Sequence, residues 1–451
     1  MARIVIIGAG SYSWGPTFLR DLFVTPALAG STICLHDIDA ERLDLNHRLG
    51  SKMIADFKLD FRLEQTLALD EALEGADFIL LTITTGGLES MRPDLEIPWK
   101  YGLRQSVGDT VGPGGIARAL RNIPVVAAMA RRVEALCPQA FFLNYTNPMS
   151  VLTRVIDRER SVRGRTIGLC HEWIGVREKL AAVFGVRPEE LLGRVAGINH
   201  FIWLTDLHAR GERVWERLPG ILEQVLSGAL DPDPSDLTPW VDKARLKARL
   251  FQIYGALPAA GDRHIAEFLP WPISEATRWG ADFGFKLTSS NDRAAAMASA
   301  RAMIESALAG DTPLEPFMQE QSGEAAGPIL SAVVSGGQYT GILNLPNRGQ
   351  LEGLPEDAIV ETCGSIDAAG AQAYAFGALP AAVQDLVERH MRVQELTVRA
   401  ALTGDRRLAL QAFLNDPFTG RLPADEVEKM MNELLEANQA YLPLFFSNKE
   451  N

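Results

Sequence analysis

The sequence has no apolar run long enough to cross a membrane. A membrane-spanning helix needs roughly 18 or more consecutive apolar residues, and no stretch of the 451 residues approaches that length. The chain starts with a charged Arg3 and the strand-like run Ile4-Val5-Ile6-Ile7, without the regions of a secretory signal peptide. We therefore expect a protein that is neither secreted nor bound to a membrane.

Positive charge is also in short supply. The 44 Lys and Arg residues are outnumbered by 57 Asp and Glu residues, which gives a formal net charge of −13. This balance disfavours nucleic acid and anionic membranes as partners. A small-molecule substrate stays possible, because a binding site can be locally basic in an acidic protein.

Cysteine is scarce as well. The chain has four widely spaced cysteines and no CxxC pair. A disulfide framework is therefore excluded, and a cytoplasmic location is expected. Cys34, Cys137 and Cys363 are interpreted as small buried hydrophobes.

Short apolar segments alternate with helical patterns in the first 195 residues. The strand-like segments are 3–8, 32–36, 78–83, 141–143 and 166–169. Apolar runs of this kind are typical of strands buried on both faces, and their alternation with helices predicts a Rossmann-type, doubly wound parallel sheet.

The pattern changes near residue 195. A hairpin pattern at 201–215, a Pro/Asp-rich loop at 231–239 and several long helical patterns follow. The length supports two domains. We predict an NAD-binding domain over 1–195 and a mixed α+β domain over 196–451 for substrate, metal and oligomer contacts, similar together to the lactate/malate dehydrogenase fold.

A dinucleotide-binding loop follows the first predicted strand. Gly8 and Gly10 lie between that strand and a helix, where glycines let a pyrophosphate approach the backbone. Ser13 replaces the third glycine of the full motif. Asp37 ends the next strand, where an acidic residue binds the adenosine ribose and favours NAD over NADP.

Polar residues follow two further buried strands. Thr84 lies in a Thr/Gly-rich loop after the strand at 78–83, a position beside a cofactor's phosphates and ribose. Asn144 and Asn147 follow the strand at 141–143. Their amides can donate and accept, which suits sugar hydroxyls and the nicotinamide ribose, although Asn/Pro sequences also form simple turns.

Cys170 and His200 each follow a predicted strand. A thiolate and an imidazole could bind one divalent metal if their loops converge, and a sugar diol could complete the coordination. These ligand types suggest zinc. Residues this far apart in sequence are more often unrelated, so the residues alone leave the metal site open.

Two aspartates are candidate acid–base groups. Asp109 lies in a glycine-dense segment before a helix, and Asp262 lies in Gly261-Asp262-Arg263-His264. A neighbour-tuned carboxyl can act as a base. A turn carboxylate and a solvated ion pair with Arg263 are the simpler alternatives.

Taken together, the motifs resemble glycoside hydrolase family 4, the NAD- and metal-dependent glycosidases. The resemblance covers nearly the whole chain, and the order of its motifs is more specific than any one of them. The matching segments are Gly8-Ala9-Gly10-Ser11, Gly112-Pro113-Gly114-Gly115, Asn144-Tyr145-Thr146-Asn147-Pro148, Cys170-His171-Glu172, Gly197-Ile198-Asn199-His200, Gly261-Asp262-Arg263-His264 and Leu345-Pro346-Asn347-Arg348-Gly349.

The resemblance implies a redox-assisted elimination. NAD⁺ takes hydride from C3 of the sugar, a base removes the C2 proton, and the aglycone leaves by β-elimination. Water then adds and NADH returns the hydride. Cys170 and His200 are implied as metal ligands, and the family usually employs Mn²⁺, which ligand softness does not indicate. Ser11 belongs to the implied cofactor site.

The resemblance also implies roles around the metal. Asp262 matches the aspartate that serves as base in members acting on unphosphorylated sugars. His171 and Glu172 occupy positions that vary with the sugar, and members acting on 6-phospho-sugars have Asn or Asp after the metal cysteine. His171 and Asp109 both remain candidates for the acid that protonates the leaving group.

Substrate contacts are implied for Asn147, Arg92 and Glu172. The predicted activity is hydrolysis of unphosphorylated α-glycosides, namely α-glucosides, α-galactosides or α-hexuronides. Trp173 stands after Glu172, where α-glucosidase-like members have valine, so the sugar stays open.

Three alternatives remain at this stage. They are a 6-phospho-glycosidase of the same family, a malate/lactate-type dehydrogenase, and a non-catalytic NAD-binding protein. A dehydrogenase would accumulate NADH in step with product. A homodimer or homotetramer is expected, with the amphipathic C-terminal helices as a candidate interface.

Overall fold

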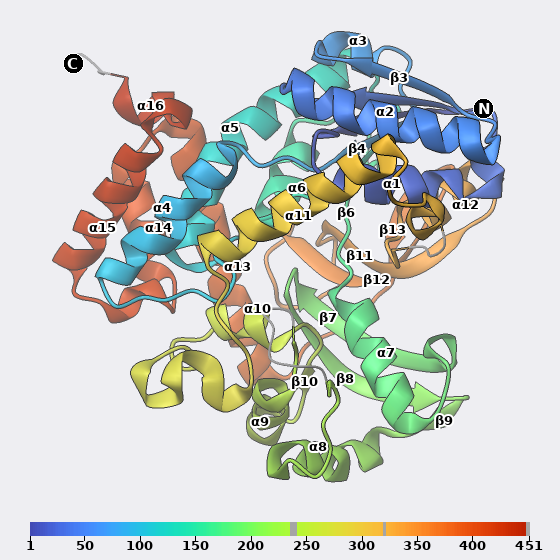
Figure 1. The fold of residues 1–451 in the computed structure, drawn as a ribbon. Coiled ribbons are helices and arrows are strands. Elements are labelled where there is room, and N and C mark those ends of the chain that lie inside the picture. The colour runs from blue at the N-terminus through green and yellow to red at the C-terminus, as the bar shows by residue number, and fades with distance from the viewer. Residues whose placement is uncertain (235–240, 319–321, 448–451) are drawn as a thin grey trace.

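A single mixed β-sheet runs through the computed structural model, which describes residues 1–234, 241–318 and 322–447 (Figure 1). The sheet has the strand order β10-β8-β7-β12-β11-β6-β5-β4-β1-β2-β3, with β13 beside β12 and β9 beside β8. The strands are β1 Arg3–Ile7, β2 Thr32–His36, β3 Arg62–Thr66, β4 Phe78–Leu81, β5 Phe141–Asn144, β6 Thr166–Gly168, β7 Leu191–Ile198, β8 Phe201–Ala209, β9 Glu212–Arg213, β10 Leu257–Pro258, β11 Tyr339–Pro346, β12 Ile359–Asp367 and β13 Gly370–Ala373.

The first six strands form the parallel half of the sheet. Their order, β3-β2-β1-β4-β5-β6, is that of a dinucleotide-binding fold. Successive β1 residues enter different cores: Ile4 and Ile6 join one face, and Val5 and Ile7 join the other. Because strand side chains alternate between faces, both faces must be covered by helices, and the predicted Rossmann-type fold class is confirmed.

The antiparallel half continues the same sheet. β11 pairs with β6, β12 with β11, and β7 with β12. The two halves are therefore joined by hydrogen bonds along β6. β7 spans Leu191–Ile198 and so crosses the position at which the two domains were divided. The division at residue 195 stays a prediction.

Helices cover both faces and one end of the sheet (Figure 1). They are α1 Trp14–Phe23, α2 Ala40–Phe57, α3 Leu69–Leu73, α4 Gly87–Lys100, α5 Gly112–Leu136, α6 Met149–Arg158, α7 Glu172–Phe184, α8 Leu218–Ser227, α9 Arg245–Tyr254, α10 Asp262–Glu267, α11 Ser290–Ala309, α12 Ala326–Val334, α13 Ala381–Thr403, α14 Arg406–Asn415, α15 Ala424–Ala437 and α16 Pro443–Phe446. Across the described ranges, no helix combines the length and apolar character that a bilayer-crossing segment needs.

Some elements differ from the sequence expectations. The hairpin predicted at 201–215 exists as β8 and β9, but the main partner of β8 is β7. β3 and α4 were not expected, because β3 is a partly exposed edge strand and α4 contains two prolines. Residues 235–240, which include much of the predicted Pro/Asp-rich loop, lie outside the described residues.

Candidate active site

The loop after β1 forms a cradle that leaves no room for side chains. Gly8 has φ 90°, and a Cβ atom there would lie 1.9 Å from the carbonyl oxygen of Thr82. The Gly10 amide donates to Asp37 Oδ2 at 2.8 Å, which joins the loop to the end of β2. The N-cap residue Ser13 makes no side-chain hydrogen bond to the first turn of α1, so the partial positive charge of this helix end can act on an anion. These features fit the pyrophosphate and ribose of a dinucleotide.

Two further residues shape this cradle. Ser11 accepts a hydrogen bond from the Trp14 amide through Oγ at 3.1 Å, which places it at the turn into α1. A Cβ atom on Gly15 would lie 2.7 Å from the carbonyl oxygen of Ala9, so Gly15 allows close packing of α1 on the loop. Close helix–strand packing is the task of the third glycine in a dinucleotide motif, and Gly15 performs it here although Ser13 does not.

Strand register brings the Cys170 and His200 segments to one part of the sheet. Gly168 of β6 is paired with Asn344 of β11, Asn344 with Glu361 of β12, and Glu361 with Gly197 of β7. Cys170 and His200 follow shortly after the two ends of this row. This pairing of strands from distant parts of the chain explains how the two segments come into one region.

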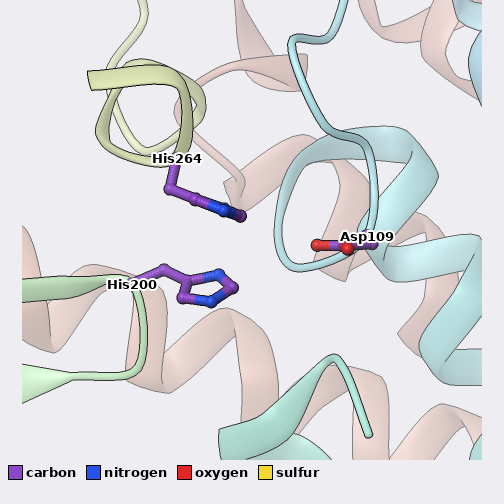
Figure 2. Close-up of side chains that lie close together, drawn as sticks. All are labelled: Asp109, His200 and His264. Atoms are coloured by element: carbon purple, nitrogen blue, oxygen red, sulfur yellow. The ribbon is translucent and has the colours of Figure 1, made fainter. Parts of the chain in front are cut away.

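Three potential metal ligands meet beside this row. Ligand atoms of Asp109, His200 and His264 all lie within 4.8 Å of one another. The two imidazole rings lie 3.8 Å apart between centroids, and Asp109 is directed toward them from the loop before α5 (Figure 2). His264 Nδ1 is buried without a hydrogen-bond partner among the described residues, as a free metal-binding nitrogen would be. This donor set fits a divalent metal.

His200 occupies a strained backbone position. It has φ 65° in the turn between β7 and β8, a conformation that residues with a side chain adopt infrequently. Burial, with His264 adding to the effect, lowers the pKa of His200 to about 3. A neutral imidazole is the form that binds a metal, so both the backbone and the charge state are consistent with a ligand role.

Cys170 lies near this cluster but is not one of its three members. Burial and the negative charges of Glu361 and Glu172 raise the pKa of the Cys170 thiol well above its ordinary value. A metal ligand must be a thiolate, so metal binding at Cys170 would release a proton. The Cys170–His200 pairing predicted from the sequence stays a prediction, and the structure adds Asp109 and His264 as candidate ligands.

Glu172 links the cysteine segment to the α10 segment. Its Oε2 accepts a hydrogen bond from the Gly261 amide at 2.5 Å, and its Oε1 lies 3.6 Å from His264 Nε2. Because Glu172 begins α7 and Gly261 precedes α10, this contact fixes the start of α7 to the start of the helix that carries His264. Glu172 was expected to bind substrate, and the structure shows a contact that positions His264.

His171 is held by a residue that the sequence did not reveal. Its Nδ1 lies 3.0 Å from Oε1 of Glu324, which precedes α12. This interaction raises the pKa of His171 to about 9, against the opposing effect of burial. His171 therefore carries a proton at neutral pH, while its side chain remains 57% exposed and accessible to a ligand.

Arg118 joins the cofactor side of the site to the metal cluster. Its Nη2 donates to Thr84 Oγ1 at 3.0 Å and its Nε donates to the carbonyl of Asn147 at 2.9 Å. Burial favours protonation of Asp109, but the charge of Arg293, reinforced by that of Arg118, keeps the pKa of Asp109 well below its ordinary value. Asn147 Oδ1 is buried without a partner among the described residues, as expected for an atom that awaits a ligand.

The carboxylate of Asp262 is bound by the first turn of α9 in this structure. Its Oδ2 accepts from the Leu246 amide at 2.8 Å and its Oδ1 from the Lys247 amide at 3.1 Å, so it caps the first turn of α9. It also pairs with the Lys247 ammonium at 3.2 Å. Burial raises its pKa to about 6 although Lys247 opposes the shift. Its role as base stays a prediction.

Asn144 and Arg92 also lie outside the cluster's contacts. Asn144 is fully buried and donates to Thr153 Oγ1 at 3.0 Å, so it shapes the turn after β5 from inside. Arg92 is exposed on α4 and pairs with Glu96 at 3.3 Å. Their expected roles in binding cofactor and substrate stay predictions.

The structure adds site residues that the sequence interpretation did not assign. His264 belonged to a recognised motif, but only the aspartate of that motif was given a role. The hydroxyl of Thr110, directly after Asp109, contacts both Asp109 and His200. Arg118 and Glu324 carried no sequence signal, because their positions depend on contacts between distant segments.

Comparisons with known proteins identify the family. The family 4 glycosyl hydrolase model matches residues 3–186, and the model of its C-terminal domain matches residues 195–419. An α-galacturonidase of Bacillus subtilis (strain 168) is 36% identical over 447 residues, covering 96% of this chain and 97% of the relative. The chain therefore belongs to glycosyl hydrolase family 4, and it is a glycosidase.

Solved structures agree with this assignment. The crystal structure of lplD from Bacillus subtilis matches with a TM-score of 0.88 and 34% identity, over 96% of this chain and 100% of that one. A 6-phospho-β-glucosidase from Thermotoga maritima, solved with manganese, NAD⁺ and glucose-6-phosphate, matches with a TM-score of 0.79. It is 22% identical over 98% of this chain and 99% of that chain, and this likeness concerns the fold.

Proposed function

We propose that this protein hydrolyses unphosphorylated α-glycosides, with α-galacturonides as preferred substrates, and that it uses NAD and Mn²⁺ or another divalent metal. The observation that carries the choice of sugar is the 36% identity, over nearly the full length of both chains, to a relative named α-galacturonidase. The glucose-6-phosphate in the 22% identical structure carries less weight. The family assignment leaves the dehydrogenase alternative without support.

The dinucleotide site is proposed around Gly8, Gly10, Ser11 and Asp37. The glycine backbone and the uncapped α1 N-terminus would hold the pyrophosphate, and Asp37 Oδ1 and Oδ2 would accept from ribose hydroxyls. A bound NAD would supply transient oxidation at the sugar, and a divalent metal would polarise the resulting ketone. Thr84 is proposed to contact the cofactor, and the hydrogen bond from Arg118 supports this role by holding the Thr84 hydroxyl in one orientation.

The metal is proposed to bind at His200 and Cys170, with Asp109 and His264 as additional ligands. Asp109, His200 and His264 already converge, and Cys170 would join them as a thiolate. The four ligands would come from four separate segments of the chain. An octahedral ion such as Mn²⁺ would then keep two positions for a sugar diol. Measuring metal affinity in single variants of the four residues decides which of them are permanent ligands.

The proton transfers are proposed for His171 and Asp262. His171 carries a proton at neutral pH, whereas Asp109 is held ionised, so His171 is the better acid for the leaving group. Asp262 is proposed as the base that removes the C2 proton, because burial raises the pKa of its carboxyl toward the range in which a general base is effective. For this role the Asp262 carboxylate must give up a hydrogen bond to an α9 amide and contact the substrate instead.

The test is a panel of p-nitrophenyl α-glycosides assayed with NAD⁺, Mn²⁺ and a thiol reductant. The panel contains the α-galacturonide, α-glucuronide, α-galactoside, α-glucoside and their available 6-phosphates. We expect the α-galacturonide to have the highest kcat/KM, and NADH not to accumulate with product. Preference for a 6-phosphate would contradict the proposed sugar, and stoichiometric NADH would contradict hydrolysis.

We also propose a homodimer or homotetramer located in the cytoplasm. The location is supported by the four cysteines, none of which is paired within the described residues. Light scattering of the purified full chain would measure the subunit number directly.

A further inference from the structure

Thr110 connects a carboxylate to a candidate metal ligand. Its Oγ1 donates to Asp109 Oδ1 at 2.7 Å and lies 2.9 Å from Nδ1 of His200. The hydroxyl is buried, so water does not compete freely for these contacts. A hydroxyl has only one proton to donate. Thr110 can therefore donate to only one of these two neighbours, and it must accept a hydrogen bond from the other.

The donor and acceptor properties of Asp109 and His200 decide which of them receives the Thr110 proton. A carboxylate oxygen accepts hydrogen bonds, and the Thr110 hydroxyl donates to Asp109 Oδ1 at 2.7 Å. The Thr110 proton therefore goes to Asp109, and the Thr110 oxygen is left as an acceptor. The contact to His200 is then satisfied only if Nδ1 of His200 carries the hydrogen.

We propose that Thr110 is a positioning residue: its hydroxyl, held by Asp109, fixes His200 as the tautomer with hydrogen on Nδ1 and so keeps the Nε2 lone pair free for the metal. This inference rests on the proposed function for the identity of the metal. It does not depend on which sugar is hydrolysed. Hydrogen bonding to the second ring nitrogen is a general way of orienting metal-binding histidines.

The surrounding loop is built to keep Thr110 in place. On one side of Thr110, Glu267 accepts from the amides of Val107 and Gly108, at 2.6 and 2.9 Å to Oε1. On the other side, Gln105 donates to the carbonyl of Val111 at 3.0 Å. Buried side chains thus hold the backbone before and after Thr110, and the hydroxyl meets His200 without rearrangement of the loop.

Packing from α5 adds a further restraint. A Cβ atom on Gly115 would lie 2.5 Å from the carbonyl carbon of Thr110, so the helix backbone rests directly against this residue. The contact with α5 and the hydrogen bonds of the loop therefore restrain Thr110. A fixed hydroxyl between a carboxylate and a ring is what tautomer selection requires.

A matched pair of variants separates the hydroxyl from the rest of the side chain. Thr110→Val keeps the branched shape and removes the hydroxyl, whereas Thr110→Ser keeps the hydroxyl and removes the methyl group. Mn²⁺ affinity is measured on the purified full chain by electron paramagnetic resonance. We expect Thr110→Val to weaken Mn²⁺ binding by about 10–100-fold and Thr110→Ser to bind like the unaltered protein.

The tautomer itself is read without metal or substrate. Nitrogen-15 NMR of histidine-labelled, metal-free protein should show Nδ1 of His200 protonated and Nε2 unprotonated, with the signal assigned by loss in His200→Gln. Thr110→Val should shift the two signals toward a mixed population, and Thr110→Ser should not.

Three results would overturn the inference. They are an Nε2-protonated His200 in the unaltered protein, equal Mn²⁺ affinity in Thr110→Val, and equal weakening in both variants. The first measurement is made on the unaltered protein, and His200→Gln serves only to assign its signal. Failure of the glycoside panel with the expected tautomer and affinities would instead refute the proposed function and leave this inference standing.

Discussion

Glu324 Oε1 lies 3.0 Å from Nδ1 of His171, and this contact joins the segment before α12 to the residue after Cys170. It raises the pKa of His171 to about 9. The ordinary value for histidine is about 6.5, so the folded protein holds a proton that the unfolded chain releases more readily. The Glu324–His171 pair should therefore affect how the stability of the protein depends on pH.

Replacing Glu324 by Gln should return the pKa of His171 toward its ordinary value. A raised histidine pKa stabilises the fold fully below about pH 6.5, and the stabilisation is lost as pH rises through about 9. Proton NMR titration of His171 in metal-free protein checks the pKa directly. An unchanged titration in Glu324→Gln would contradict the assignment of this ion pair.

Replacing Cys170 by Ser should weaken Mn²⁺ binding by at least about tenfold and remove most of the hydrolytic activity. Cys363→Ser is the matched control, because Cys363 is also a partly buried free cysteine. The raised pKa of the Cys170 thiol means that the metal competes with a proton. Mn²⁺ affinity should therefore rise with pH, and titrations at pH 6 and 8 check this.

Replacing Arg121 by Met should destabilise the protein by about 3–5 kcal/mol, because it leaves a buried carboxylate unpaired. Arg121 and Asp94 are both fully buried and form two hydrogen bonds, of 2.9 and 2.6 Å. The control is Arg131→Met, whose pair with Glu159 is partly exposed and should contribute about 0–1 kcal/mol. Urea unfolding measures both, and equal losses would contradict the prediction.

Replacing Gly8 by Ala should abolish measurable NAD binding. The added Cβ would collide with the Thr82 carbonyl, and φ 90° is unfavourable for alanine. Gly220→Ala is the control, because a Cβ there meets no atom within 4 Å. Calorimetry with NAD⁺ compares the two variants, and full affinity in Gly8→Ala would exclude the proposed cradle.

The parallel half of the fold could be predicted because its buried strands have unbroken apolar sequences, as in Phe78–Leu81. β3 could not, because Arg62–Thr66 is an edge strand with partly exposed polar residues. The pairing of β6 with β11, which joins the two halves of the sheet, could not be predicted from the sequence either. It depends on pairing with Asn344, which is distant in sequence and has no local signal.

Site residues could be proposed from the sequence mainly where they follow a strand. Cys170 and His200 were proposed for that reason, and their role as metal ligands stays a prediction. His264 is placed by the contact of Glu172 with Gly261, 89 residues away, which no local pattern encodes. Asp262 is the opposite case. Its motif predicted a catalytic base, whereas in the folded chain its carboxylate oxygens accept hydrogen bonds from the first turn of α9.

The pairing of β6 with β11 also determines whether a shortened chain with only the parallel half of the sheet could fold. A fragment that stops near residue 195 would lose β11 and β12, and β6 would become an open sheet edge with unpaired amides and carbonyls. Exposed edges recruit other strands and promote aggregation. A soluble nucleotide-binding fragment would therefore need the later strands supplied as a second polypeptide, and co-expression of the two pieces should recover what neither yields alone.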